Sequence, residues 1–208
     1  GQMHKDSAAA LIFNVWADEL TRALLVNKLG AQRFQTLYGK RHFRPAVEGI
    51  LARNDPFWCG SGDCHAQVSL ALDRALSRIA ERQGTDLSKW RWGAWHPAVS
   101  SHRPFGKVPY LNGLFDVRTE SHGDLFTVNV GQYWANDLQE PFANRHAASM
   151  RAIYDLAAPE HSLFIYQTGQ SGHAFDPRSK SMAKAWATGQ YRALQTQADA
   201  VHLLTLKP

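Results

Sequence analysis

Apolar residues recur at helical spacing through much of the first hundred positions. One stripe of leucines and a valine predicts a helix over Ala8–Leu29, with Asp6-Ser7 as its cap and Gly30 as its stop. A second stripe predicts a helix over Ala66–Arg82, which is also followed by a glycine. Each predicted helix has one apolar face, so we expect these faces to pack against a common core.

After residue 100 the pattern changes to the short alternations that are typical of strands. Segments with this pattern are Leu125–Val130, Met150–Leu156, Ser162–Tyr166 and Val201–Leu206. A short helix is predicted over Ser181–Gly189. Helices followed by antiparallel strands indicate an α+β fold, with a mainly helical segment over residues 1–101 and a strand-rich segment over residues 102–208.

Composition is that of an ordinary globular protein. The 208 residues are 44% hydrophobic and 20% charged. The longest apolar run, Ala8–Phe13, is far shorter than the ~20 residues of a membrane span, so no membrane contact is expected. No signal peptide is visible at the start of the sequence.

The charge balance is basic but not concentrated. Lys and Arg exceed Asp and Glu by 23 − 18 = +5, and the bases are scattered along the chain. The densest cluster, residues 40–44, is too short for the basic stripe that tracks nucleic-acid phosphates. The sequence therefore predicts no nucleic-acid partner.

A glycine-rich turn offers a candidate nucleophile. Gly169-Gln170-Ser171-Gly172 follows a predicted strand, as the serine of a G-x-S-x-G elbow would. The elbow, however, needs a glycine where His173 stands and a helix where Phe175 and Pro177 follow. The simpler interpretation is a turn in which Ser171 satisfies backbone groups.

The two cysteines, Cys59 and Cys64, are five positions apart and His65 follows them. A zinc site would need a second matching pair of ligands, which the sequence does not offer. The pair could close a small disulfide loop in an oxidising compartment, or remain two buried thiols. The disulfide is the favoured alternative.

The ten histidines do not form a metal site by their spacing. None stands in an H-x3-H or H-E-x-x-H arrangement, so the sequence predicts no metal ligands in this chain. Motif spacing alone also predicts no catalytic residues.

Several stretches, taken in order, resemble the penicillin acylase family. They are Trp90–His96, Ser101–Gly106, Gly123–Asn129, Ser149–Leu156, Gly169–Gly172 and Trp186–Tyr191, with Phe13–Trp16 and Asp55–Cys59 upstream. The family includes penicillin amidases and acyl-homoserine-lactone acylases. Each motif is weak alone, but their order and gaps cover nearly the whole chain.

The resemblance implies an N-terminal-nucleophile hydrolase with an αββα sandwich. In this family a precursor cuts itself into an α chain and a β chain, and the serine that opens the β chain attacks an amide carbonyl. Its own α-amino group acts as the base, because a serine hydroxyl is a poor nucleophile until a base takes its proton. An asparagine and a backbone N–H hold the oxyanion.

The matched motifs belong to the last part of the family's β chain. This chain begins with Gly1, which has no side-chain nucleophile. We therefore expect a C-terminal fragment of a β subunit with no catalytic residues of its own and no cofactor. The serine, the oxyanion asparagine and any calcium ligands would lie on other segments of the same precursor, which are the expected partners together with a small N-acyl amide substrate.

Phe57 and Trp58 are the candidate substrate-binding residues. The resemblance places their segment beside the entrance to the nucleophile, where they would form an apolar wall. The alternative is that both anchor a loop in the core. The family and the cysteine pair imply a periplasmic or secreted protein.

Two other functions stay open. The chain could be a non-catalytic binding or assembly domain that retains the fold, or a stand-alone serine hydrolase that uses Ser171.

Overall fold

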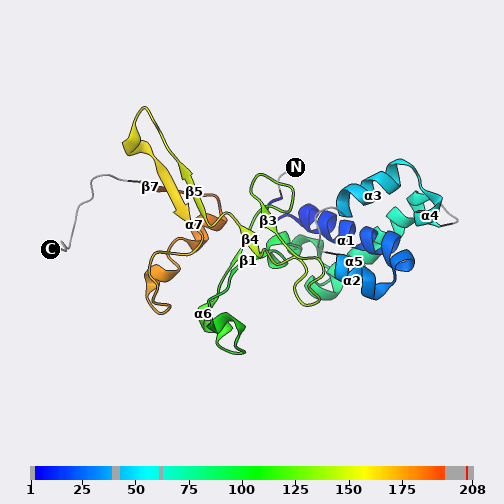
Figure 1. Cartoon of the computed structure of the whole chain (residues 1–208), viewed down its shortest axis with the longest axis horizontal. Helices are drawn as coiled ribbons and strands as arrows, with labels where there is room; N and C mark the ends of the chain where they lie inside the picture. The colour runs from blue at the N-terminus through cyan, green and yellow to red at the C-terminus, as the bar shows by residue number, and fades with distance from the viewer. Residues whose placement is uncertain (1–2, 39–42, 61–62, 195–204, 206–208) are drawn as a thin grey trace. The chain divides into compact units, whose positions relative to one another are not determined.

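The structure is a computed structural model, and it describes residues 3–38, 43–60, 63–194 and 205 (Figure 1). The chain forms two compact units, residues 1–147 and residues 148–208. Each unit has its own set of buried apolar side chains.

Helices make up the first part of unit 1, coloured blue to cyan in Figure 1. They are α1 (Ala8–Leu29), α2 (Ala31–Leu37), α3 (Phe43–Ala52), α4 (Pro56–Cys59) and α5 (Cys64–Gln83). The predicted helix Ala8–Leu29 is confirmed at both ends. The Ser7 hydroxyl accepts a hydrogen bond from the Ala10 N–H at 3.1 Å, and Gly30 takes a φ of 79° that favours glycine.

The core of unit 1 lies between α1 and α5, which pack along each other. The predicted helix Ala66–Arg82 corresponds to α5, which begins two residues earlier and ends one residue later. Ala71 and Ala75 on α5 are fully buried, and their small side chains allow α1 to approach closely. Leu11, Val15 and Leu24 of α1 are fully buried in the same core.

Short strands and turns complete unit 1. Strand β1 (Pro97–Ser100) pairs antiparallel with β2 (Val117–Glu120), and β3 (Gly131–Gln132) pairs antiparallel with β4 (His146–Ala147). The short helix α6 (Asn112–Phe115) precedes β2. The 3₁₀ turns among the described residues are η1 (Leu87–Lys89), η2 (Trp92–Ala94), η3 (Phe105–Lys107), η4 (Pro159–His161) and η5 (Pro177–Ser179).

The predicted strand Leu125–Val130 is wrong. This segment forms turns, because side chains bond to the nearby backbone and replace a strand ladder. The Asp124 carboxylate accepts a hydrogen bond from the Phe126 N–H, and the Thr127 hydroxyl bonds to the backbone of Asp124 and of Asn129. The alternating pattern therefore marks a compact loop.

Unit 2 is a three-stranded antiparallel sheet with one short helix. Strand β6 (Leu163–Tyr166) lies between β5 (Met150–Ile153) and β7 (Arg192–Ala193), and α7 (Ala183–Ala187) packs on β6. Ile165 of β6 and Met182, Ala183, Trp186 and Ala187 in and beside α7 are buried.

These elements agree with the strands predicted over Met150–Leu156 and Ser162–Tyr166 and with the helix predicted over Ser181–Gly189, although each is shorter than predicted. The strand predicted over Val201–Leu206 lies outside the described residues, apart from Thr205.

The chain is α+β with antiparallel strand pairing, as the sequence predicts. The division into segments 1–101 and 102–208 stays a prediction. Among the described residues, no helix combines the length and the apolar character needed to cross a membrane.

Candidate functional site

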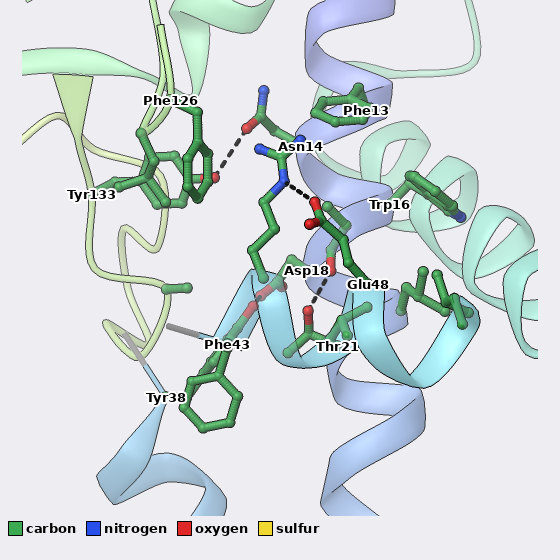
Figure 2. A pocket seen from close by; sticks show the side chains of 17 residues that line it. Phe13, Asn14, Trp16, Asp18, Thr21, Tyr38, Phe43, Glu48, Phe126 and Tyr133 are labelled. Carbon is green, nitrogen blue, oxygen red and sulfur yellow. Dashed lines mark hydrogen bonds and ion pairs between the residues drawn. The ribbon is translucent and has the colours of Figure 1, made fainter. Parts of the chain in front are cut away.

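A cavity of about 230 Å³ in unit 1 is lined by α1, α3 and the loop that carries Phe126 (Figure 2). Most of its lining is apolar. Six ring-bearing side chains contribute to it: Phe13, Trp16, Tyr38, Phe43, Phe126 and Tyr133. Since apolar cavities of about 150 Å³ hold a benzene ring, this one has room for a ring and a short tail.

Three polar residues of α1 also line the cavity. Asn14, Asp18 and Thr21 are spaced by four and three positions, so they lie on one face of the helix. The Tyr133 hydroxyl donates a hydrogen bond to Asn14 Oδ1 at 3.0 Å, and the Thr21 hydroxyl donates to the Ala17 carbonyl at 2.7 Å. Asn14 and Thr21 are therefore already bonded within the protein.

Asp18 is buried and has two cationic partners. Its Oδ2 atom lies 3.0 Å from Arg22 Nε and 2.6 Å from Arg78 Nη1, and the Tyr38 hydroxyl donates to Oδ1. Burial, and then the negative charge of Asp18, raise the pKa of Tyr38 well above its usual value, so Tyr38 keeps its proton. Removing both guanidinium groups would leave the buried charge of Asp18 uncompensated, which costs about 3–5 kcal/mol.

Arg44 is a cation in the lining of the cavity, and its side chain is 36% exposed. Its guanidinium carbon is 4.3 Å from the ring centre of Phe126 and 5.2 Å from that of Phe13. Among the described residues, Glu48 supplies the one acidic group within 4 Å of Arg44, with Oε1 at 3.4 Å from Nε (Figure 2). The Glu48 side chain is 67% exposed, so this ion pair is weak.

The two predicted substrate-binding residues lie on α4 and do not line this cavity. Phe57 is 61% exposed and not a core residue, and the Lys28 ammonium lies 4.7 Å from its ring centre. Trp58 packs partly against the core and edge-on to Phe57, with 5.2 Å between ring centres. Their role in substrate binding stays a prediction.

The cysteine pair forms the predicted disulfide. Cys59 and Cys64 are bonded, and the bond joins the end of α4 to the start of α5. Their exposed fractions are 1% and 4%, so the bond belongs to the core. Among the described residues, no group of three or more His, Cys, Asp or Glu side chains is arranged to hold a metal ion.

In the described part of the chain, Ser171 shows no strong base among its hydrogen-bond partners. Its hydroxyl accepts a hydrogen bond from the His173 backbone N–H and also bonds to the Asp176 carboxylate. Hydrogen bonds from Arg178 hold the pKa of Asp176 far below its usual value. Asp176 is therefore a very weak base, and a stand-alone Ser171 hydrolase loses its support.

His96 is a fully buried histidine of unit 1. Its Nδ1 lies 2.7 Å from the Phe142 carbonyl oxygen, and its ring stacks on Trp92 at 4.5 Å. Burial lowers the pKa of His96 to about 4, so the ring is neutral at pH 7. A Cβ on Gly131 would lie only 2.4 Å from Nε2, so the ring packs closely against the Gly131 backbone.

The cavity residues were not predicted from the sequence as a site. Arg44 stands in a basic cluster that only suggests surface charge, and Tyr133 is more than one hundred positions from Asn14. One signal was available: Asn14, Asp18 and Thr21 place polar groups on a face of α1 that is otherwise buried.

Comparison with protein-family models gives one family for this chain. The family model for penicillin amidase matches residues 1–202. No match is found among curated proteins.

Among solved structures, the chain is similar to a thermostable penicillin G acylase from Alcaligenes faecalis, with 13% sequence identity and a TM-score of 0.51. The similarity covers 97% of this chain and 39% of that chain, so this chain spans about two fifths of the solved one. The identity is low enough that this likeness shows the shared fold alone. The match to the family model over residues 1–202 shows that the chain belongs to the penicillin amidase family.

Proposed function

We propose that this chain is the C-terminal part of the β subunit of an amidase that cleaves N-acyl amide bonds. The family match over residues 1–202 carries the proposal. The span of 39% of the solved relative supports the presence of further segments in the working enzyme.

The chemistry requires a serine that this chain does not supply. In the proposed reaction, the N-terminal serine of another segment attacks the amide carbonyl, and its α-amino group takes the hydroxyl proton. The amine leaves with that proton, and water then releases the acid from the acyl-enzyme. The oxyanion donors and any bound calcium belong to the same other segments.

This chain would then supply scaffold and part of the substrate entrance. Phe57 is exposed next to Trp58, as an apolar wall for an acyl group would be. The proposed substrates are N-acyl β-lactams or N-acyl-homoserine lactones. The buried Cys59–Cys64 disulfide is consistent with a periplasmic or secreted enzyme, because such bonds persist in oxidising compartments.

The alternative is a binding or assembly domain that retains the fold without catalysis. The weak base bonded to Ser171 fits this alternative and the amidase segment equally, because neither uses Ser171 as a nucleophile. Both alternatives predict that this chain alone does not hydrolyse amides, so activity of the isolated chain cannot separate them.

Native purification separates them. We expect intact-mass analysis and N-terminal sequencing of the non-denatured protein to reveal co-purifying chains, one of which begins with serine. That complex should hydrolyse chromogenic N-acyl anilides, and replacing its N-terminal serine with alanine should abolish the activity. A lone folded species of 23.3 kDa would exclude the amidase and leave the binding domain.

A further inference from the structure

We propose that the cavity of unit 1 binds a small aryl- or alkyl-carboxylate, with the apolar group between α1 and α3 and the carboxylate on Arg44. This site differs from the proposed substrate wall at Phe57 and Trp58, and the inference does not depend on the proposed function.

The shape of the cavity limits the apolar part of the ligand. A volume of about 230 Å³ exceeds the roughly 150 Å³ that holds benzene, and rings line it on several sides. Aromatic faces and edges favour a second aromatic ring at 4.5–7 Å. One ring with a chain of two or three carbons fits this space.

Arg44 determines the charge of the ligand. Its guanidinium lies over the Phe13 and Phe126 rings, and the ion pair with Glu48 joins Nε to Oε1 at 3.4 Å. No other acceptor among the described residues bonds to it. A planar guanidinium binds a carboxylate through two parallel hydrogen bonds, so a ligand carboxylate can use N–H groups that Glu48 leaves.

An amine does not fit as well as an acid. The Phe13 and Phe126 rings of the lining already hold a cation, the guanidinium of Arg44. The buried Asp18 is compensated by Arg22 and Arg78, so it offers no uncompensated negative charge to an ammonium group. Glu48 is the nearest exposed anion, and it should compete with the ligand carboxylate for Arg44.

The probe that tests the site is 3-phenylpropanoate, with the uncharged 3-phenylpropan-1-ol as its matched control ligand. Calorimetric titration of the chain with the acid should give a dissociation constant of about 0.1 to a few mM. Arg44→Gln should weaken binding of the acid about tenfold and leave binding of the alcohol unchanged.

Two further variants test whether the charge of Arg44 itself, and not the overall charge of the protein, determines the affinity for the acid. Lys28→Gln removes a cation that also lies over an aromatic ring, Phe57, but outside the cavity, so it should leave both affinities unchanged. Glu48→Gln should tighten binding of the acid, because it removes the competing carboxylate.

Filling the cavity tests its location. Ala17→Leu on α1 places a larger side chain in the lining and should abolish binding of both ligands. Binding is compared only for variants whose midpoint of urea unfolding equals that of the native chain. A folding defect is then not counted as lost binding. Failure of the acid to bind, equal losses in Arg44→Gln and Lys28→Gln, or full binding by Ala17→Leu would each overturn the proposal.

Discussion

Buried polar residues in unit 1 are stabilised in two different ways. The negative charge of the Asp18 carboxylate is compensated by the Arg22 and Arg78 guanidinium groups, and the Tyr38 hydroxyl donates a hydrogen bond to it. His96 instead stays neutral, since its ring is stacked on Trp92 and its Nδ1–H donates to a backbone carbonyl. Because a neutral histidine gains a proton when the chain unfolds, the burial of His96 makes the stability of unit 1 depend on pH.

The His96 arrangement predicts acid sensitivity. The unfolded histidine has a pKa near 6.5 and the folded one about 4, so the unfolded chain binds the proton first as pH falls. The stabilisation is complete above pH 6.5 and declines towards pH 4, by roughly 3 kcal/mol in total. Urea unfolding at several pH values should show a steeper decline for the native chain than for His96→Gln.

His65→Gln is the matched control for this prediction, because His65 is exposed on α5. It should retain the slope of the native chain between pH 6.5 and 4. If His96→Gln retains that slope as well, burial of this ring does not set the acid sensitivity.

At the scale of elements, sequence periodicity predicted the long helices well and the loops poorly. The helix Ala8–Leu29 is correct to the residue because a full apolar stripe, a serine cap and a glycine stop agree. The alternation over Leu125–Val130 gave a wrong strand because the Asp124 and Thr127 side chains bond to the backbone of neighbouring residues, which local propensity does not indicate.

The cavity could not be predicted for a related reason. It joins α1 to Arg44 on α3 and to the segment that carries Phe126 and Tyr133, and no sequence spacing brings these together. The disulfide was predicted because its two cysteines are only five positions apart and have no other pairing partner.

The disulfide should stabilise the corner between α4 and α5. Closing a loop of this length restricts the unfolded chain by roughly 2 kcal/mol. We expect a reductant to lower the free energy of unfolding of the native chain by about this amount in urea titrations. The Cys59→Ala/Cys64→Ala variant is the control and should not respond to the reductant; an equal response would mean that the reductant acts elsewhere.

At the scale of the whole molecule, the chain has two compact units with separate cores. The core of unit 2 is small and depends on Trp186, which is 2% exposed. Its indole N–H donates to the Ala148 carbonyl at 2.8 Å, and the Arg151 guanidinium lies 4.7 Å from its ring centre. One side chain thus holds α7 against the sheet.

Trp186→Ala should therefore unfold unit 2 selectively. Loss of a buried tryptophan costs about 3–5 kcal/mol, which a small unit cannot offset. Hydrogen exchange should show lost protection in β5 and β6, with protection in α1 and α5 retained. Trp134→Ala, at a position that is 53% exposed in unit 1, should leave both units protected. Joint loss of protection in α1, α5, β5 and β6 would contradict separate unfolding.

The burial of the Cys59–Cys64 bond also has a kinetic consequence. A thiolate must reach a sulfur atom to reduce a disulfide, and exposed fractions of 1% and 4% shield both sulfurs in the folded chain. Reduction must therefore wait until α4 separates from α5. At a reductant concentration high enough to reduce every opened molecule, the rate of reduction equals the rate of that opening. The reduction rate of the disulfide then measures how fast α4 and α5 separate locally in the folded chain.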